Sequence, residues 1–361
     1  MTENNIANVR DNTSFLSKLT SVASPSGFET EATKVFKEEV GSFLTPICKN
    51  EDKFGNVWYY HGSGAKTILL SAHIDEVFAV VTNISDDGMI SIGPAGGIDK
   101  KDLPASKVVF LRDNGTLSGG VVIKNPIHIE YREETQDKVL KFEDLKIDVG
   151  CEKKDEVIAR GIHPGTPVLY DRLSNFNFGK YRMHSVGLDD KIGVFVAEEV
   201  FRSILLSDKK NWMDEYTVYC LAATQEEVGC RGVCVAARNI NPDISIDFDV
   251  TFATDGDMGL NKAKYGDISL GKGPVICYGP EKSLRLNLAL KNAADGFYQE
   301  EAGGRAGGTN TDNIQRFSED CETTLVSIPN RSMHTRVETC DWRDVQGAVD
   351  MVSKAIIECK L

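Results

Sequence analysis

The sequence of 361 residues lacks any apolar run that approaches the roughly 18 residues a membrane-spanning helix needs. Its first twelve residues, MTENNIANVRDN, also lack the apolar core of a secretory signal. Positive charge is scarce: the chain has 41 lysines and arginines but 54 acidic residues, so its formal net charge is -13. This balance argues against nucleic acid and anionic membrane surfaces as partners. We therefore expect a cytoplasmic protein that binds neither.

Cysteine pairs of the C-x-x-C type are absent, although the chain contains nine cysteines. Without an export signal these are expected to be reduced thiols. Cys230 and Cys234 follow a pair of glutamates closely enough to be considered as metal ligands. Small, half-buried side chains are the favoured interpretation of both. The chain also lacks internal repeats and low-complexity linkers.

What the chain does contain changes character twice. Before residue 78 and after residue 173, helical apolar spacing alternates with continuous apolar runs of strand length. This pattern is typical of a mostly parallel sheet with helices on both faces. Between them, short β-rich segments are joined by Asp-Asp-Gly and Asp-Asn-Gly turns, which favour antiparallel hairpins. The prediction is an α/β catalytic domain, 1–78 and 173–361, interrupted by a small antiparallel β-barrel-like domain, 79–172.

Histidine and acidic side chains follow the apolar runs of the predicted sheet or open a helix beside it. They are His73 and Asp75 after TILLSA, Glu226 and Glu227 after YTVYCLAATQ, Asp249 in SIDFDV, His334 beyond TTLVSIP, and Asp189 and Asp190 at a helix start. Open parallel sheets bind ligands beyond the carboxyl ends of their strands. These five segments are therefore expected to converge on one site.

Each of these residues has a simpler explanation when it is taken alone. The negative charges of Asp189 and Asp190 could stabilise the start of the helix, through its macrodipole, by about 0.3–1 kcal/mol. His73 could be a hydrogen-bonded core histidine, and the double glutamate a solvated strand end. A buried strand aspartate is costly unless it is paired or binds a metal. Asp247 and Asp249 share a face of a regular strand, so periodicity does not choose between them.

Two histidines with several carboxylates form a ligand set suited to zinc or a similar ion. A site with two ions needs a bridging carboxylate, a water held between the metals and a general base that binds neither. The adjacent Glu226 and Glu227 fit this need, because neighbouring side chains diverge and one can ligate while the other takes a proton. In His73-x-Asp75, the carboxylate suits the task of orienting a metal-binding imidazole.

Several stretches resemble one family of enzymes and run in that family's order over essentially the whole chain. They are PSGFE (25–29), FGN (54–56), SAHIDEV (71–77), GLDDKIG (187–193), TQEEVG (224–229) and DVTFATD (249–255), with the late His334. The family is that of the dinuclear-metal aminopeptidases of the glutamyl aminopeptidase and tetrahedral (TET) aminopeptidase type. The β-rich insertion falls where this family has its dimerisation domain.

The resemblance implies a zinc-exopeptidase-like fold and an aminopeptidase that removes N-terminal residues from peptides. It implies two divalent ions per subunit, zinc with cobalt or manganese as alternatives, and favours Asp249 over Asp247. The implied ligands are His73 and Asp249 on one ion, Glu227 and His334 on the other, and Asp189 between them.

The resemblance further makes Glu226 the general base, which accepts a proton from the bridging water, and Asp75 the residue that orients the imidazole. Gly308 and Thr309 lie in GGTNTD, a stretch similar to a Gly-Gly-Thr-Asp segment of the family, and are expected in the substrate cleft. Peptide substrates and a homo-oligomer, either a dimer or a twelve-subunit shell, are the expected partners.

This sequence departs from the family at Lys191, where an arginine is common, and in the acidic stretch DGDMG at 255–259. Other functions fit these residues less well than the aminopeptidase does. A deacylase or carboxypeptidase would use a similar ligand set. A glycoside hydrolase needs two carboxyl groups roughly 5–10 Å apart across a sugar bond, which adjacent glutamates suit poorly, and it gives the histidines no role. The complete ligand set argues against an inactive scaffold.

Overall fold

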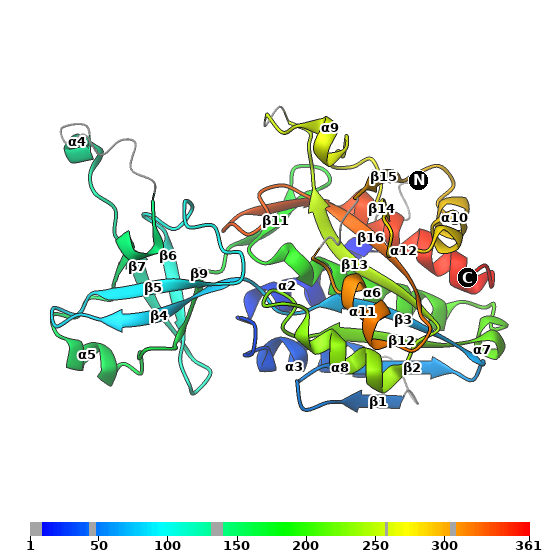
Figure 1. Cartoon of the computed structure of the whole chain (residues 1–361), viewed down its shortest axis with the longest axis horizontal. Helices are drawn as coiled ribbons and strands as arrows, with labels where there is room; N and C mark the ends of the chain where they lie inside the picture. Colours follow the sequence, from blue (N-terminus) through cyan, green and yellow to red (C-terminus); the bar gives the residue numbers. More distant parts are fainter. Residues whose placement is uncertain (1–8, 43–47, 131–139, 257–258, 304–307) are drawn as a thin grey trace. The chain divides into compact units, whose positions relative to one another are not determined.

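The computed structural model describes residues 9–42, 48–130, 140–256, 259–303 and 308–361, which belong to two compact units. Unit 1 comprises Met1–Asp75, Ser174–Met333 and Val337–Leu361, and unit 2 comprises Glu76–Leu173 and His334–Arg336. Figure 1 shows the elements of both units in the colours of the sequence. Within the described residues, every helix is too short or too polar to cross a membrane.

Unit 1 is built on a mixed sheet with the strand order β1-β2-β12-β3-β13-β16-β14-β15. Its centre is parallel and consists of β12 (Tyr216–Ala223), β3 (Lys66–His73), β13 (Ile244–Phe252) and β16 (Glu322–Asn330). The outer strands are β1 (Cys48–Glu51), β2 (Val57–Gly62), β14 (Val275–Tyr278) and β15 (Gln299–Ala302). Of these, β2 and β14 pair antiparallel with the centre. The mostly parallel core predicted from the continuous apolar runs is confirmed.

Helices cover both faces of this sheet. Successive side chains of a strand point to opposite faces, and here both faces have apolar side chains that must be buried. On β3, Ile68 and Leu70 lie in the larger apolar core, whereas Leu69 lies in the smaller one. The larger core includes residues of α2 (Thr13–Ser21), α3 (Thr30–Ser42), α6 (Leu188–Leu206), α10 (Leu284–Ala293) and α12 (Trp342–Ile357). The smaller core includes residues of α8 (Arg231–Ile240) and α11 (Thr311–Phe317).

A second sheet of unit 1 has three strands, β10 (Ser174–Phe178), β11 (Arg182–Ser185) and β17 (Glu338–Asp341), in the order β10-β11-β17. The short helices α7 (Trp212–Glu215) and α9 (Lys262–Tyr265) complete the unit. Since β11 directly precedes α6 and β17 pairs with β11, this small sheet fixes the start of α6.

The helix α6 runs through the larger core and buries an acidic side chain there. Glu198 is fully buried. Burial, and then the nearby carboxylates of Glu199 and Glu39, raise the pKa of Glu198 well above its ordinary value of 4.5, against the opposing effect of Arg202. Glu198 is therefore protonated over a pH range in which the same residue of the unfolded chain is ionised.

We expect Glu198→Gln to reduce the loss of stability at high pH. The free energy of unfolding of the wild type falls as pH rises from the unfolded pKa through the raised folded pKa, because the folded state binds the extra proton. Glutamine does not titrate. Urea denaturation at pH 5 and pH 9 measures the effect, and Glu38→Gln, at an exposed position of α3, is the control. Equal pH dependence in Glu198→Gln and the wild type would contradict the expectation.

Unit 2 is a closed antiparallel barrel with the strand order β4-β5-β8-β7-β6-β9. The two predicted hairpins are confirmed as β4 (Phe78–Ile84) with β5 (Ile90–Ala95), and β6 (Lys107–Leu111) with β7 (Leu117–Val122). The barrel is closed by β8 (Lys146–Asp148) and β9 (Pro167–Tyr170). The short helices are α4 (Ile127–Glu130), η1 (Phe142–Asp144) and α5 (Lys154–Ala159). The predicted fold class, an α/β domain interrupted by a small barrel, is confirmed.

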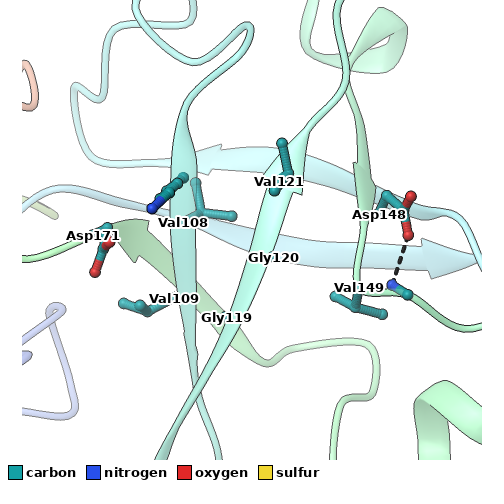
Figure 2. A pocket seen from close by; sticks show the side chains of 10 residues that line it. Val108, Val109, Gly119, Gly120, Val121, Asp148, Val149 and Asp171 are labelled. Atoms are coloured by element: carbon teal, nitrogen blue, oxygen red, sulfur yellow. Dashed lines mark hydrogen bonds between the residues drawn. The ribbon is translucent and has the colours of Figure 1, made fainter.

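A groove of about 390 Å³ lies beside β6 and β7 of the barrel. Figure 2 shows Val108, Val109, Val121 and Asp148 among the residues that line it. Valine and glycine make up most of its lining. The groove therefore differs in chemistry from the histidine and carboxylate site predicted at the sheet edge of unit 1.

Candidate active site

His73 is the last residue of β3 and is only 2% exposed. Its Nε2 lies 3.1 Å from Asp189 Oδ1, 3.8 Å from Glu226 Oε2 and 4.0 Å from Asp249 Oδ1. Its Nδ1 lies 3.1 Å from the main-chain oxygen of Asp75 and 3.4 Å from Oδ1 of the same residue. Asp75 therefore fixes one ring nitrogen, and the other is turned to carboxylates that come from three further segments.

His73, Asp189 and Asp249 form a candidate metal-binding cluster, since one ligand atom from each lies within 4.8 Å of the other two. All three side chains are buried, and they come from β3, the start of α6 and β13. An oxygen of Asp189 also lies within 4.8 Å of an oxygen of Glu227. Asp189 thus stands next to ligand atoms on two sides, as a bridging carboxylate must.

The cluster holds more negative charge than its single imidazole can balance. Burial lowers the pKa of His73, but Glu226, Asp189 and Asp75 outweigh it and raise this pKa well above its ordinary value. Burial also raises the pKa of Asp249 well above its ordinary value, with His73 opposing. Buried carboxylates are costly unless cations accompany them. One imidazole with several carboxylates suits zinc or a similar divalent ion, so the residues present fit a metal centre.

Asp190 has a different task from its neighbour Asp189. Its Oδ1 accepts the N–H of Gly193 at 3.0 Å, and its Oδ2 accepts the N–H of His73 at 3.2 Å. A Cβ on Gly193 would approach Asp190 Oδ1 to 2.3 Å, so glycine is required at this position. Asp190 therefore caps the regular part of α6 and ties it to the end of β3. Asp190 thus has a hydrogen-bonding role at the helix start.

Asp247 lies two residues before Asp249 on β13, and its carboxylate is occupied by groups of the chain. Its Oδ1 accepts the hydroxyl of Ser71, and its Oδ2 accepts the N–H and the hydroxyl of Thr311 at 3.1 and 3.2 Å. These bonds join β13 to β3 and to the first turn of α11. Asp247 therefore links elements, while Asp249, closer to the strand end, contributes to the cluster.

The loop between β12 and α8 carries the adjacent glutamates. Gln225 adopts a left-handed conformation with φ 56°. The N–H groups of Gly229 and Cys230 both donate to the carbonyl of Glu226 at 2.8 Å, which closes a tight turn. Burial raises the pKa of Glu226 to about 8, with His73 opposing and Glu227 adding to the rise. The turn brings Glu226 to His73 and Glu227 to Asp189, so the two glutamates diverge within one site.

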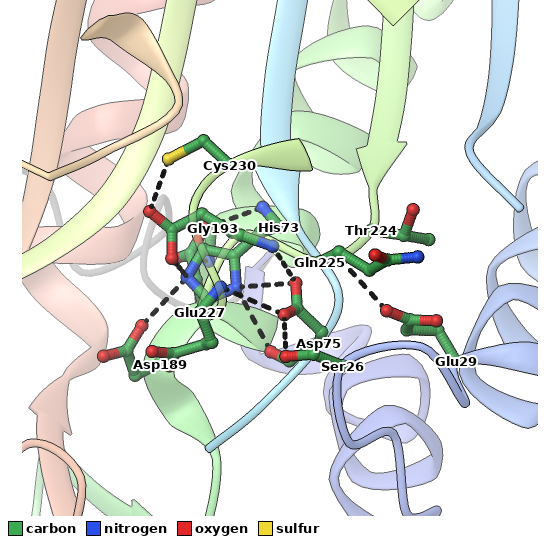
Figure 3. Close-up of polar contacts among 12 residues, drawn as sticks. Ser26, Glu29, His73, Asp75, Asp189, Gly193, Thr224, Gln225, Glu227 and Cys230 are labelled. Atoms are coloured by element: carbon green, nitrogen blue, oxygen red, sulfur yellow. Dashed lines mark hydrogen bonds and ion pairs between the residues drawn. The ribbon is translucent and has the colours of Figure 1, made fainter. Parts of the chain in front are cut away.

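The carboxylate of Asp75 holds this loop. Its Oδ1 accepts the N–H of Glu226 at 2.9 Å, and its Oδ2 accepts the N–H of Glu227 at 3.1 Å. Ser26 donates its hydroxyl to Oδ2 at 2.6 Å, and Figure 3 shows Asp75 between Ser26 and His73. Asp75 therefore positions both glutamates in addition to facing His73.

The other predicted site residues lie as follows. His334 belongs to unit 2, where its Nδ1 is 3.0 Å from the carbonyl oxygen of Gly97. Gly308 and Thr309 lie in unit 1 and are separated from α11 by Asn310, and Gly308 donates its N–H to Asp312 Oδ2 at 2.8 Å. The rest of the glycine-rich stretch, residues 304–307, lies outside the described residues.

The two cysteines weighed as ligands have other contacts. Cys230 donates its thiol to Glu226 Oε1 at 3.3 Å, and Cys234 donates its thiol to the carbonyl of Cys230 at 3.1 Å. Neither belongs to a candidate metal cluster of the described residues. The non-ligand interpretation of both agrees with these contacts.

One carboxylate at the site was not predicted at all. Glu338, on β17, accepts the N–H of Asp189 on its Oε2 at 2.8 Å and is only 2% exposed. It lies 149 residues from its partner in sequence. Its neighbours in the sequence form no motif, so only the paired small sheet reveals its place.

Residues 55–351 match the M42 glutamyl aminopeptidase family. The chain is 31% identical to lysyl aminopeptidase of Pyrococcus furiosus over 311 residues. This match covers 85% of this chain and 86% of that protein. It is 27% identical over 350 residues to a putative aminopeptidase of Acetivibrio thermocellus, covering 94% and 97% of the two chains.

Solved structures of similar fold include an aminopeptidase from the archaeon Desulfurococcus kamchatkensis, with 32% identity, a TM-score of 0.84 and coverage of 96% of this chain and 94% of that chain. A TET aminopeptidase from a marine sediment Thaumarchaeota archaeon is 25% identical, with a TM-score of 0.85 and coverage of 98% and 100%. The TET1 peptidase of Pyrococcus horikoshii, which can assemble into a tetrahedron or a large octahedral shell, is 26% identical, with a TM-score of 0.80 and coverage of 95% and 98%.

Proposed function

Because the chain belongs to the M42 glutamyl aminopeptidase family and is a peptide hydrolase, we propose that it removes N-terminal residues from peptides at a dinuclear metal centre, with Glu226 as general base. One observation carries this proposal. The buried cluster of His73, Asp189 and Asp249 has the carboxylate of Glu226 beside it, with Oε2 3.8 Å from His73 Nε2. A carboxylate next to ligands, rather than among them, is suited to take a proton.

The proposed centre holds two divalent ions, zinc with cobalt or manganese as alternatives. Its ligands in the proposal are His73 and Asp249 on one ion, Glu227 and His334 on the other, and Asp189 as the bridge. When bound, the ions would lower the pKa of a water held between them and polarise the scissile carbonyl.

The residues of the chain have separate tasks in the proposed reaction. Glu226 accepts the proton of the attacking water and later donates it to the departing amine. Asp75 holds the main chain of Glu226 and Glu227 and keeps the imidazole of His73 oriented. Acidic side chains near the centre favour the α-amino group of a peptide, which accounts for a preference for free N-termini.

Two further parts of the proposal concern the cleft and the assembly. Gly308 and Thr309 are proposed to contact the substrate, and residues 79–172 are proposed as a dimerisation domain of a homo-oligomer, a dimer or a twelve-subunit shell. The similar structure of PhTET1-12s is a dodecamer, and the TET1 peptidase of Pyrococcus horikoshii can assemble into a tetrahedron or a large octahedral shell, which supports the twelve-subunit shell. A cytoplasmic location is part of the same proposal.

A substrate panel tests the proposed reaction. We expect aminoacyl-anilides with a free α-amino group to be hydrolysed on the order of 100-fold or more faster than their N-acetylated counterparts, because a site built for a charged group rejects analogues that lack it. Acidic, basic and aliphatic aminoacyl groups are compared on the purified protein loaded with zinc. Preferential hydrolysis of N-acyl amino acids would instead identify a deacylase.

A further inference from the structure

Three consecutive main-chain N–H groups, those of residues 225 to 227, point to acidic side chains from the N-terminal part of unit 1. Asp75 accepts the second and third of these groups. The first, the N–H of Gln225, donates to Glu29 Oε1 at 3.1 Å. Figure 3 shows Glu29 next to Gln225 and on the side of the loop opposite to the metal cluster.

Glu29 is itself held rigidly. It directly precedes α3, and its carbonyl accepts the N–H of Thr33 at 2.9 Å in the first turn of that helix. Its Oε1 also accepts the N–H of Gly27 at 2.7 Å. The side chain and the main chain of Glu29 are thus both fixed by contacts that do not involve Gln225.

The position of Glu29 is costly for a carboxylate. The residue is only 5% exposed, and within the described part of the chain it forms no ion pair with lysine, arginine or histidine. Burial raises its pKa to about 7, against the N–H donors that lower it. Buried charged groups without a cation are rare unless their hydrogen bonds have a specific use.

The conformation of Gln225 indicates what the buried carboxylate of Glu29 does. Its φ of 56° lies in the left-handed region, which side-chain-bearing residues seldom adopt without support from their surroundings. This conformation turns the chain so that the next two N–H groups reach Asp75. An acceptor for the N–H of Gln225 stabilises the turn at the residue directly before Glu226.

We propose that Glu29 is a positioning residue for the hydrolytic reaction: it holds the left-handed turn at Gln225 and so fixes the main chain from which Glu226 and Glu227 project. The inference rests on the proposed function for its effect on turnover, whereas its effect on the loop does not depend on that function.

A pair of variants of equal side-chain length tests this role. Glu29→Gln keeps an acceptor oxygen, and Glu29→Met fills the same space without one. Met leaves the N–H groups of Gly27 and Gln225 without this acceptor but also removes a buried carboxylate, and these effects on stability oppose one another, so the variant is expected to fold. We expect Glu29→Met to lower kcat on the order of 10- to 100-fold with little change in KM, because small misplacements of reacting groups are costly. Glu29→Gln should restore kcat to within about threefold of the wild type.

Hydrogen–deuterium exchange supplies a readout that needs no substrate. In the zinc-loaded full chain, the amide of Gln225 is expected to exchange on the order of 10-fold faster in Glu29→Met than in Glu29→Gln, because only the Met variant leaves the N–H without an acceptor. Glu31→Met is the control, since Glu31 lies two residues after Glu29, in the first turn of α3, with a side chain that is 53% exposed. It should change neither exchange nor turnover.

The outcomes separate the two ideas. Equal exchange and equal turnover in the Met and Gln variants of an active enzyme would overturn the positioning role and leave the proposed function intact. Faster exchange in Glu29→Met, in a protein whose wild type hydrolyses no aminoacyl substrate, would support the role in the loop and refute the proposed function.

Discussion

Glu226→Gln is expected to lower kcat on the order of 10²- to 10⁴-fold while the protein keeps its bound metal, because the variant loses the carboxylate that, in the proposed function, accepts the proton of the attacking water. The amide has the shape of the carboxylate, and the main-chain contacts of residue 226 with Asp75 do not involve its side chain. Cys230 can still donate its thiol to an oxygen at Oε1. Binding of the substrate should change little, so the loss should be in kcat rather than in KM.

The neighbouring residue provides the matched comparison. Glu227→Gln has the same change of chemistry one position along the chain, but the proposal makes Glu227 a ligand, so this variant should lose metal as well as turnover. Steady-state kinetics on aminoacyl-anilides, combined with metal analysis of both purified variants, measures the difference. Near-native turnover in Glu226→Gln would show that another group is the base.

Removal of divalent ions by a chelator is expected to abolish hydrolysis and to lower the melting temperature. Without cations, the buried carboxylates of Asp189 and Asp249 repel one another beside a single imidazole. A ligand present at 100 times its dissociation constant adds about 2.7 kcal/mol to the free energy of unfolding. Added zinc, cobalt or manganese should restore activity, and the extent of restoration ranks the three ions.

Asp249→Asn tests whether stabilisation by divalent ions depends on the cluster of His73, Asp189 and Asp249. Asparagine is a weaker ligand than a carboxylate but removes one repelling charge, so the metal-free variant should be no less stable than the metal-free wild type. Its melting temperature should respond much less to added zinc. Thermal melts with and without chelator compare the two proteins. Full turnover after chelation would instead favour a metal-free hydrolase, such as a glycosidase.

Much of the fold follows from local patterns in the sequence. The Asp-Asp-Gly and Asp-Asn-Gly turns predict the two hairpins of the barrel, because their glycines, Gly88 and Gly115, supply a positive φ. The continuous apolar runs predict the parallel strands, since those strands are covered on both faces. The carboxyl-terminal parts of β3 and β13 then bring His73 and Asp249 to one edge, where the start of α6 adds Asp189.

The division of tasks among neighbouring acids could not be predicted in this way. Asp190 and Asp247 differ from Asp189 and Asp249 only in which main-chain and hydroxyl groups lie within reach of their oxygens. Those partners come from other elements, as with Asp247 and Thr311, which are 64 residues apart. Periodicity within one strand or helix contains no information on such distant contacts.

The role of Glu29 could not be predicted from the sequence either. PSGFE marks its surroundings as similar to a family, but the partner of Glu29 is a main-chain N–H 196 residues away. A main-chain group has no identity in the sequence, so no pattern of residue types could reveal this contact. His334 differs again, because its type is recognisable while its position in the chain's other unit depends on the course of a loop.

The hold on residues 225 to 227 acts through main-chain N–H groups, which every amino acid except proline possesses. A different side chain at position 225 is therefore expected to leave the main chain of Glu226 and Glu227 in place. The left-handed φ of 56° narrows that freedom, since it favours glycine and asparagine and disfavours β-branched residues. Gln225 is half-buried, so a substitution of its side chain is expected to change the local surface while the main-chain hydrogen bonds of the loop remain.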